Sequence, residues 1–582
     1  MKMGKHNRTS VRHWRMPGRA GVRFMKKYSL DSLARMLFML AMTAGALSAQ
    51  TNPSTEIVLK GDAQGKSSPL VHYWSKVVGA GRANEGLRST WQEELQTVHR
   101  DAGFQYVRFH GLFHNDMFVY REDDQGRPVY NYQYVDDLFD RMLAVGVRPF
   151  VELGFVPDEM ATAKATSFWW KANGGPPSDY AKWSDMVSHI VRHWVDRYGV
   201  EEVRQWYFEV WNEPNLVRHF FAGTQEQYFE LYKVSARAVK GVDPALRVGG
   251  PATSNFILDK EALKVAQSSR PSFDPLSIPW KPIWIEEFLS YCKANQLPVD
   301  FVSTHPYPQD FAIEDGSPRT ATPRFRRSID STRDDLRILR KIVNASPYPK
   351  AEIQLTEWSS SPSPLDHSHD GLAAAAFILK TNLDSVGLVD SLSYWVFTDV
   401  FEEERKIDSV FHGGFGMINY QQIAKPAFHA YRYLHQLGDE VISQGDGAIL
   451  TRDHSSGDIT ALVYNYPPEQ LTALPKTENV EEADRIDGSG SSRKVKLEIS
   501  NLAPGALFQI EVLDREHGNA VWAWEQMGRP DPPSRAQVVE LRRAALSTLK
   551  YQAEADSAGN LKIDRAIAPW SVILIRQARK QQ

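Results

Sequence analysis

The feature that most constrains this fold is a repeated alternation of short apolar segments with amphipathic helical segments, which runs from about Lys76 to Tyr394. The helical segments follow a 3.6-residue period; in one of them Val135, Leu138 and Met142 fall on a single face. Strands that alternate with helices form parallel sheets. The expected strands are Val77–Gly79, Tyr106–His110, Pro149–Leu153, Tyr207–Trp211, Arg247–Gly250, Phe301–His305, Ile353–Glu357 and Ser391–Val396.

Eight strand–helix units in roughly 320 residues predict an α/β fold of the (β/α)8 TIM-barrel type with insertions. A doubly wound open sheet is the alternative architecture. Such a sheet would normally carry a glycine-rich first turn for a nucleotide, and Gly79-Ala-Gly81-Arg matches that turn only weakly.

The chain changes character after about Pro426, where short strand-like runs replace the alternation. Lys494–Ser500 alternates apolar with polar residues, as a half-buried strand does, whereas Thr477–Arg493 is polar and Gly/Ser-rich and predicts a loop. A β-sandwich is the expected form of this second unit. The expected domains are a barrel (71–430), an accessory β-sandwich (431–582) and an N-terminal segment (50–70) that pairs with the sandwich.

Residues 1–49 have the pattern of an export signal. Nine Lys or Arg and no acidic residue precede Asp31, an apolar stretch runs from Met36 to Leu47, and small residues follow it. The apolar stretch is too short to span a bilayer, and the long basic lead makes Met25 an alternative start. We therefore expect a secreted or periplasmic protein that is not held in the membrane once the signal is removed.

Charge and cysteine content exclude several classes of function. Removing residues 1–48, with 10 basic residues and 1 acidic residue, would change the formal charge from −3 to −12. Nucleic-acid binding depends on neutralising phosphates, so no nucleic-acid partner is expected. The single cysteine, Cys292, cannot form an internal disulfide and is expected to be buried in the helix Trp284–Asn295. The sequence shows no metal-ligand cluster and no phosphate-binding loop, so neither a metal nor a cofactor is expected.

Polar residues at the ends of the expected strands mark the candidate site, because TIM-barrel active sites lie at the carboxyl ends of the strands. They are Arg108, His110, Glu152, Asn212, Glu213, His305, Tyr307 and Glu357. Glu213 and Glu357 each end a strongly apolar strand. Glycoside hydrolysis needs one protonated and one ionised carboxyl, about 5–5.5 Å apart for retention and roughly 6.5–9.5 Å apart for inversion. A lone Glu at a strand end is more simply explained by a salt bridge, so the surrounding residues decide.

The residues around both glutamates resemble those of known glycosidases. Trp211-Asn-Glu-Pro214 resembles the acid/base motif of the large clan of (β/α)8 retaining glycosidases, and Glu357-Trp358 resembles the clan's nucleophile. Further strings narrow the resemblance to glycoside hydrolase family 39, the β-xylosidases and α-L-iduronidases, over about residues 70–430. They are Val78-Gly-Ala-Gly-Arg-Ala-Asn-Glu-Gly-Leu87, Val107-Arg-Phe-His-Gly111, Ser303-Thr-His-Pro-Tyr-Pro308, Tyr394-Trp-Val-Phe-Thr-Asp-Val-Phe-Glu-Glu403 and Phe411-His-Gly-Gly-Phe-Gly416.

The resemblance implies that Glu213 is the acid/base and Glu357 the nucleophile. It also implies a sugar pocket lined by His110, Asn212, His305, Tyr307, Trp395, Glu402 and Glu403. Carboxylates can accept hydrogen bonds from vicinal hydroxyls, and an indole offers a flat face to a sugar ring. Simpler interpretations stay open: a loop contact for His305, core packing for His110 and Trp395, and a solvated run for the two glutamates. Trp169 and Trp170 are either a subsite wall or the anchor of their loop.

The expected function is removal of terminal β-1,4-xylosyl residues from xylo-oligosaccharides by double displacement. An α-L-iduronidase is the alternative; its uronic substrate would require Arg or Lys in the pocket, whereas the loops around Glu402 and Glu403 are acidic and aromatic. A carbohydrate-binding protein without catalysis is a further alternative. The expected partner is the oligosaccharide substrate, and a homo-oligomer stays open.

Overall fold

The computed structural model describes residues 55–162, 165–216, 220–254, 284–310, 325–403, 407 and 409–578. The expected export signal (1–49) lies outside the described residues, so the signal and the secreted or periplasmic location stay predictions. Among the described helices, none combines the length and apolar character that a bilayer crossing requires.

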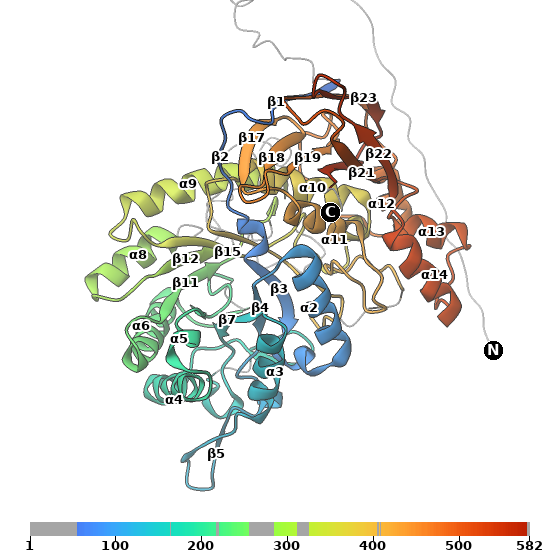
Figure 1. Ribbon diagram of the computed structural model, residues 1–582. Coiled ribbons are helices and arrows are strands. Elements are labelled where there is room, and N and C mark those ends of the chain that lie inside the picture. The colour runs from blue at the N-terminus through green and yellow to red at the C-terminus, as the bar shows by residue number, and fades with distance from the viewer. Residues whose placement is uncertain are drawn as a thin grey trace, which may run out of the picture. The chain divides into compact units, whose positions relative to one another are not determined.

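Eight parallel strands close into a barrel (Figure 1). They follow one another around the barrel in chain order, and the ring closes where Tyr394 pairs with Val78. Each expected strand overlaps an observed one, and the predicted TIM barrel is confirmed. The strands are β3 (Val77–Arg82), β4 (Tyr106–His110), β7 (Arg148–Leu153), β10 (Tyr207–Val210), β11 (Arg247–Thr253), β12 (Phe301–Thr304), β15 (Glu352–Trp358) and β16 (Ser391–Tyr394).

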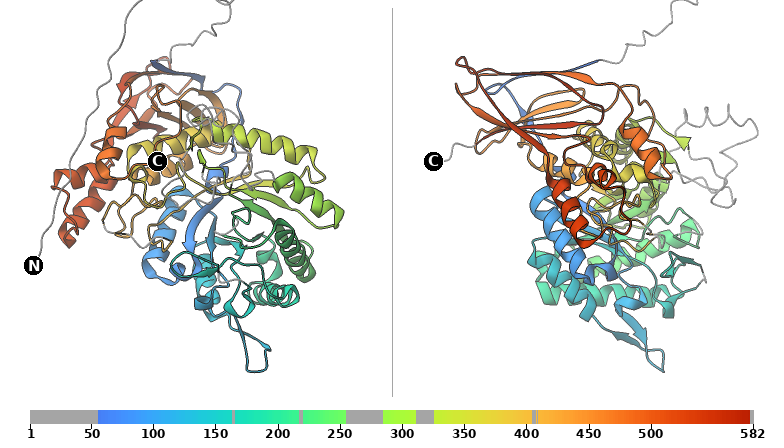
Figure 2. Two further views of the ribbon diagram at one scale, coloured as in Figure 1. Left: turned by 180° about the vertical axis from the view of Figure 1, so that it is seen from behind. Right: turned by 90° about the vertical axis from the view of Figure 1, so that its right-hand side faces the viewer.

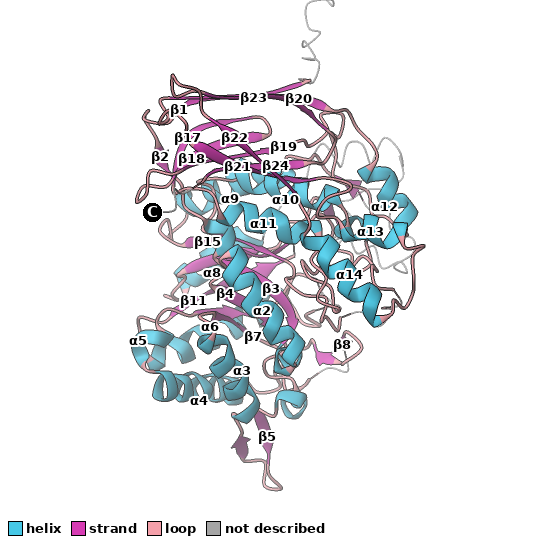
Figure 3. Ribbon diagram, turned by 45° about the vertical axis from the view of Figure 1, so that its right-hand side comes forward, coloured by secondary structure: helices cyan, strands magenta, loops and turns pink. Residues whose placement is uncertain are grey.

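Helices cover the outside of the barrel, as the cyan coils of Figure 3 show. Cys292 is buried on its helix, as predicted. The side chain of Asp179 caps the helix Tyr180–Tyr198 by accepting the backbone N–H groups of Ala181 and Lys182. The helices are α2 (Ser89–Ala102), α3 (Gln133–Ala144), α4 (Tyr180–Tyr198), α5 (Val200–Val203), α6 (Gln225–Val242), α8 (Trp284–Ala294), α9 (Ser331–Ala345), α10 (Leu372–Asp384) and α11 (Pro426–His435).

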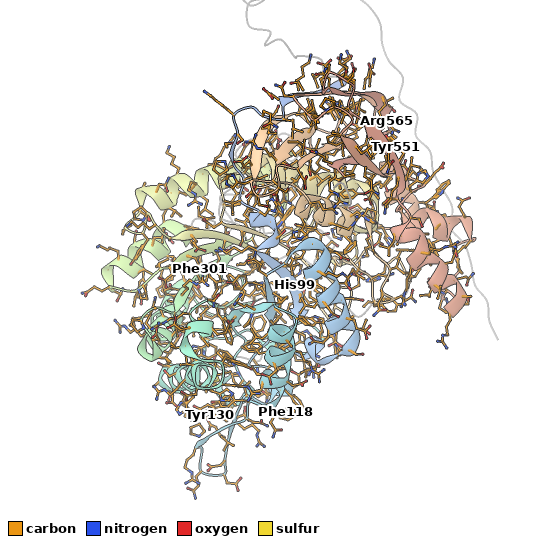
Figure 4. The ribbon with its side chains drawn as sticks, viewed as in Figure 1. His99, Phe118, Tyr130, Phe301, Tyr551 and Arg565 are labelled. Atoms are coloured by element: carbon orange, nitrogen blue, oxygen red, sulfur yellow. The ribbon has the colours of Figure 1, made fainter. Side chains whose placement is uncertain are left out.

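The barrel interior is built in layers of different polarity. One layer is apolar and consists of Val77, Tyr106, Phe150, Tyr207 and Phe301, the last labelled in Figure 4. Side chains alternate between the two faces of a strand, so the residues two positions further along also face inward. These residues, all buried, are Gly79, Arg108, Glu152, Glu209 and Ser303. A polar layer therefore separates the apolar layer from the carboxyl ends of the strands.

A β-sandwich follows the barrel in the chain, as expected, and forms the upper part of Figure 2. Its two sheets enclose an apolar core, and Arg565 on one sheet donates to the Tyr551 hydroxyl on the other (Figure 4). The seven-stranded sheet contains β2 (Ser68–Pro69), β17 (Glu440–Gly445), β18 (Ala448–Arg452), β19 (Ile459–Tyr464), β24 (Val572–Gln577), β21 (Leu507–Leu513) and β22 (Leu549–Glu554). The three-stranded sheet contains β1 (Glu56–Asp62), β20 (Arg493–Ser500) and β23 (Leu561–Ile567).

Three helices accompany the sandwich: α12 (Val480–Asp487), α13 (Ala520–Gln526) and α14 (Arg535–Leu546). The predicted loop Thr477–Arg493 was wrong where α12 forms. Asn479 caps this helix, and Ala483 is its one buried residue, so the apolar period that would reveal a helix is missing. Asp487 at its end accepts the backbone N–H groups of Leu372 (2.8 Å) and Ala373 (2.9 Å), which ties α12 to the start of α10.

Short hairpins extend the loops between barrel elements. The longest protrusion, β5 (Tyr120–Glu122) with β6 (Pro128–Tyr130), points away from the sandwich in Figure 2. The others pair β8 (Thr166–Ser167) with β9 (Ala172–Asn173) and β13 (Gln309–Asp310) with β14 (Phe325–Arg326).

The strand β1 precedes the barrel in the chain but belongs to the sandwich. It pairs in parallel with β20, from Glu56 opposite Lys494 to Asp62 opposite Ser500. Its side chains alternate: Leu59 is 1% exposed in the sandwich core, whereas Val58 is 46% exposed. The N-terminal strand therefore closes one side of the sandwich core.

We predict that Leu59→Ala lowers the free energy of unfolding by about 2–5 kcal/mol, because it leaves a cavity in the sandwich core. The neighbouring Val58→Ala removes an exposed side chain and should stay within about 0.5 kcal/mol of the parent protein. Calorimetric and urea unfolding of the purified variants measure both effects. Equal losses for the two variants would contradict the role of β1 in the core.

Candidate active site

Glu213 and Glu357 meet at the carboxyl ends of their strands, β10 and β15, although 143 residues separate them in the chain. Both are buried. One oxygen of each carboxyl group and one ring nitrogen of His305 lie within 4.8 Å of one another. This closeness corresponds to the spacing of retaining glycosidases and leaves less room than the roughly 6.5–9.5 Å of inverting enzymes.

The same three residues are also compact enough to be considered for a metal ion. Their hydrogen bonding gives a different reason for the compactness. The Nδ1 atom of His305 lies 3.0 Å from Oε1 of Glu213 and 3.6 Å from Oε2 of Glu357. The Nε2 atom of His305 forms a hydrogen bond with the hydroxyl of Thr356. Contacts among protein groups therefore account for how close together the three residues lie.

An unusual backbone turn directs Glu213 into the barrel mouth. Trp211 and Glu213 have φ angles of 74° and 43°, in the left-handed region that side chains other than glycine rarely occupy. Each such residue costs about 1–3 kcal/mol and persists where its surroundings fix it. Here the Glu213 N–H donates to the carbonyl of Ala252 (2.8 Å), and the Trp211 indole donates to the carbonyl of Phe220 (3.0 Å). The strained turn and its two anchors together orient the carboxyl group.

A fully buried arginine, Arg108, lies beneath the carboxyl pair. It donates to Glu209 (2.6 Å) and to Oδ1 of Asn212 (2.8 Å), and its guanidinium is 2.9 Å from Glu152 and 3.5 Å from Glu357. Burial opposes its charge, but these three carboxylates together hold the pKa of Arg108 above its usual value. The arginine therefore stays charged and orients both Asn212 and the candidate nucleophile.

The two glutamates of the pair have different electrostatic surroundings. Burial, and then the negative charge of Glu357, raise the pKa of Glu213 well above its usual value. Burial also raises the pKa of Glu357, but Arg108, His110 and a hydrogen bond from Tyr307 oppose that rise. The Tyr307 hydroxyl donates to Oε1 of Glu357 at 2.7 Å. Glu213 is thus the better candidate for the proton, and Glu357 for the negative charge.

Most of the residues expected to bind sugar surround this pair. His110 contacts Glu152 (2.7 Å) and Glu403 (3.4 Å), and its ring lies 4.8 Å from that of Trp395. Several buried polar atoms at the site have no hydrogen-bond partner among the described residues, and they include Nδ2 of Asn212, Oε2 of Glu357 and Oε1 of Glu403. Buried polar groups usually have partners, so unpaired atoms gathered at one place are suited to bind a polyhydroxylated ligand.

The adjacent residues Glu402 and Glu403 have different environments. Glu402 accepts from Arg82 at 2.9 and 2.6 Å and also from Arg88, so protein donors already engage both its oxygens. Glu403 is partly buried, and desolvation, followed by the charge of Glu357, raises its pKa well above the usual value. The structure thus places Glu403 at the carboxyl pair, whereas a direct sugar contact for Glu402 stays a prediction.

The paired tryptophans after the third barrel strand also differ. Trp170 is buried, stacks on Phe168 at 5.1 Å and lies 4.9 Å from the guanidinium of Arg82. Trp169 is 40% exposed. The anchoring interpretation therefore fits Trp170, and the exposed face of Trp169 leaves a subsite wall open for that residue alone.

Sequence reasoning missed Glu209 and Thr356, which lie within strands, and Glu85. The Thr356 hydroxyl donates to Glu209 at 2.8 Å, and Glu85 accepts the backbone N–H of Glu402 at 2.6 Å. A signal for Glu209 was present: it follows the inward-facing Tyr207 by two positions, as Arg108 follows Tyr106. Glu85 lies in the short 3-10 helix Ala83–Leu87, which is too short to show a periodic pattern.

We predict that Gly79→Ala displaces Trp395 and impairs catalysis. A Cβ atom at Gly79 would lie 2.4 Å from Cε3 of the Trp395 ring and 3.1 Å from the backbone oxygen of Tyr394, so the indole must move. Small displacements of positioned groups cost up to about 100-fold in rate, and we expect kcat/KM to fall at least about ten-fold. Gly241→Ala, whose Cβ would meet nothing within 4 Å, is the control and should keep kcat/KM. An unchanged kcat/KM in a folded Gly79→Ala enzyme would contradict a role for the ring position.

Comparison with known proteins agrees with this geometry. The family model "Glycosyl hydrolases family 39" matches residues 57–562. Curated β-xylosidases from Geobacillus stearothermophilus and Caldicellulosiruptor saccharolyticus are 35% and 34% identical over 87% and 86% of this chain and 93% and 94% of their own lengths. The crystal structure of a monomeric β-xylosidase from Caulobacter crescentus superposes with a TM-score of 0.76 at 31% identity, over 89% of this chain and 99% of that one. The chain therefore belongs to glycosyl hydrolase family 39 and is a retaining glycoside hydrolase.

Proposed function

We propose that this enzyme removes terminal β-1,4-xylosyl residues from xylo-oligosaccharides by double displacement, with Glu357 as nucleophile and Glu213 as acid/base. The observation that carries the proposal is the close pair of buried carboxyls whose surroundings differ in the sense that the two roles require. The names of the full-length relatives support xylose as the sugar.

In the first step an oxygen of Glu357 forms a bond to the anomeric carbon while the glycosidic bond breaks. Glu213 gives its proton to the departing oxygen, so the leaving group departs as a neutral alcohol and Glu213 becomes a carboxylate. Tyr307 and Arg108 hold Glu357 in place from two sides. The product of this step is a covalent glycosyl ester on Glu357.

In the second step water attacks the anomeric carbon from the face that the leaving group vacated. Glu213 takes the proton of the water, and the bond between the sugar and Glu357 breaks. Two inversions give net retention, and both glutamates return to their initial protonation states. In this proposal sugar hydroxyls bind Nδ2 of Asn212 and Oε1 of Glu403, two buried atoms that have no hydrogen-bond partner among the described residues.

The charges of the site favour a neutral sugar over a uronic acid. A substrate carboxylate would need an available Arg or Lys. Among the described residues, Arg108, Arg82 and Arg88 contact carboxylates of the site, and each is already paired with them. The partly buried Glu403 would also repel a second carboxylate if it were ionised.

We predict that Glu357→Ala and Glu213→Ala each lose most activity on xylo-oligosaccharides, by a factor of about 10⁴ or more for the nucleophile. Azide should restore turnover of an aryl β-xyloside by Glu357→Ala with an α-xylosyl azide product, because it attacks in place of the carboxylate. With Glu213→Ala, azide should replace water in the second step and give the β-product. NMR of the products determines the anomeric configuration of each glycosyl azide. Wild-type rates in both variants would overturn the assignment.

We also predict that an aryl β-xyloside has the highest kcat/KM in a panel of aryl glycosides of xylose, arabinose, glucose and iduronate. The reason is that the paired arginines leave the pocket without a free cation for a carboxylate among the described residues. Preference for the iduronide would favour the iduronidase alternative. Calorimetric binding of xylose without turnover of any substrate would favour a non-catalytic binding protein.

A further inference from the structure

A chain of three buried hydrogen bonds links Glu213 to a glutamate that the reaction does not use. Oε1 of Glu213 lies 3.0 Å from Nδ1 of His305, and Nε2 of His305 lies 2.9 Å from the hydroxyl of Thr356. That hydroxyl lies 2.8 Å from Oε1 of Glu209. All four residues are buried, so within this chain each polar atom depends on its neighbour rather than on bulk water.

Glu209, at the far end of the hydrogen-bond chain, determines which group donates and which accepts in each hydrogen bond. The Nε atom of Arg108 donates to Oε2 of Glu209 at 2.6 Å, which holds this group as a carboxylate that can only accept. Thr356 has a single hydroxyl proton, and it must donate that proton to Glu209. The Thr356 oxygen can then only accept from His305, so the hydrogen lies on Nε2 of His305.

A neutral imidazole carries one hydrogen. Burial lowers the pKa of His305 well below its usual value, and the charges of Arg108 and His110 lower it further. With its hydrogen on Nε2, the Nδ1 atom presents a lone pair to Glu213. A hydrogen bond at 3.0 Å then requires Glu213 to be the donor.

The opposite direction would place the proton on Glu209 and leave Glu213 ionised. It would neutralise the carboxyl that touches Arg108 and would leave a negative charge on Glu213, beside Glu357. Each consequence is unfavourable in a buried site. The arrangement of hydrogen bonds in which Glu213 is protonated and Glu209 is ionised is therefore the more stable one.

We propose that Glu209 and Thr356 are positioning residues that fix the tautomer of His305 and thereby keep Glu213 protonated before the first step. The proposal rests on the proposed role of Glu213 as acid. It adds two residues to the machinery that touch neither the sugar nor the reacting atoms, and it assigns His305 an orienting role.

Other charged and titratable groups also face Glu213 and His305. The ones that the described elements bring to them are Glu357, Arg108, Glu152, His110, Tyr307 and Glu403. Removing the hydroxyl of Thr356 leaves all six in place. Its effect on the protonation of Glu213 therefore isolates the hydrogen-bond chain.

We predict that Thr356→Val lowers the pKa of Glu213. Without the hydroxyl, Nε2–H of His305 would be a buried donor without an acceptor, which is costly. The hydrogen moves to Nδ1, where it donates to the Glu213 carboxylate and stabilises the ionised form. The basic limb of the kcat/KM profile should move to lower pH by about one unit, a ten-fold loss of activity above that limb. The acidic limb, which reports Glu357, should move less.

Two variants make this experiment specific. Thr356→Ser keeps a hydroxyl and should return the basic limb to its wild-type pH. Thr304→Val removes another buried hydroxyl at the same end of the barrel, one bonded to Thr253 at 2.9 Å, and should leave the limb where it is. A basic limb that stays in place, or moves to higher pH, in Thr356→Val would overturn the proposal.

A second measurement uses the wild-type enzyme and needs no turnover. NMR of protein labelled with ¹⁵N-histidine, with the His305 signals identified by their loss in His305→Gln, should show a neutral ring protonated on Nε2. A ring protonated on Nδ1, or on both nitrogens, at the pH of highest activity would sink the proposal. Because this readout is independent of catalysis, it separates failure of the hydrogen-bond chain from failure of Glu213 as the acid, which the azide experiment tests.

Discussion

The site depends on one buried charge, the guanidinium of Arg108. A buried cation is tolerated only when it is paired and hydrogen-bonded, and Arg108 is paired with Glu209, Glu152 and Glu357. One positive charge cannot balance three carboxylates together with Glu213 and Glu403, which lie close by. Protonation of the carboxyl groups that do not contact a cation reduces the excess negative charge. The pKa values of Glu213 and Glu403 are raised accordingly. The different roles proposed for Glu213 and Glu357 follow from which of them Arg108 reaches.

The fold and the candidate catalytic pair could be predicted from sequence because both depend on local patterns. Apolar runs such as Tyr207–Val210 end at the residues that enter the mouth, and the topology of a TIM barrel brings all such ends together. Polar residues inside strands were harder to interpret. Glu209 and Thr356 gain their roles from partners about 100 to 150 residues away, Arg108 and each other, and no spacing along the chain encodes those contacts. Helix α12 escaped prediction for a related reason, since it is held through Asp487 and the backbone of α10 rather than through an apolar face.

The loop after the last barrel strand shows how adjacent residues acquire different roles. Both of its glutamates looked alike in sequence, as two acceptors for sugar hydroxyls. In the structure Arg82 and Arg88 engage Glu402, while its backbone N–H donates to Glu85. Burial raises the pKa of Glu85 to about 8, so this contact is made by a group that is largely neutral at pH 7. Glu402 thus fixes the backbone from which Glu403 reaches the carboxyl pair.

The same loop is also fixed by a second set of contacts, at Asp399. Asp399 accepts the backbone N–H of Gly416 at 2.7 Å and pairs with the buried Lys425 at 2.6 Å, which in turn pairs with Asp370 at 2.7 Å. An additional Cβ at Gly414 would lie 2.3 Å from Asp399, so the turn must approach the carboxylate closely. Breaking a buried ion pair by removing one partner is strongly destabilising, because the other charge stays buried. The segment from Trp395 to Glu403 is therefore held by ion pairs at Asp399 and Glu402, and the side chains near the carboxyl pair do not have to supply that rigidity themselves.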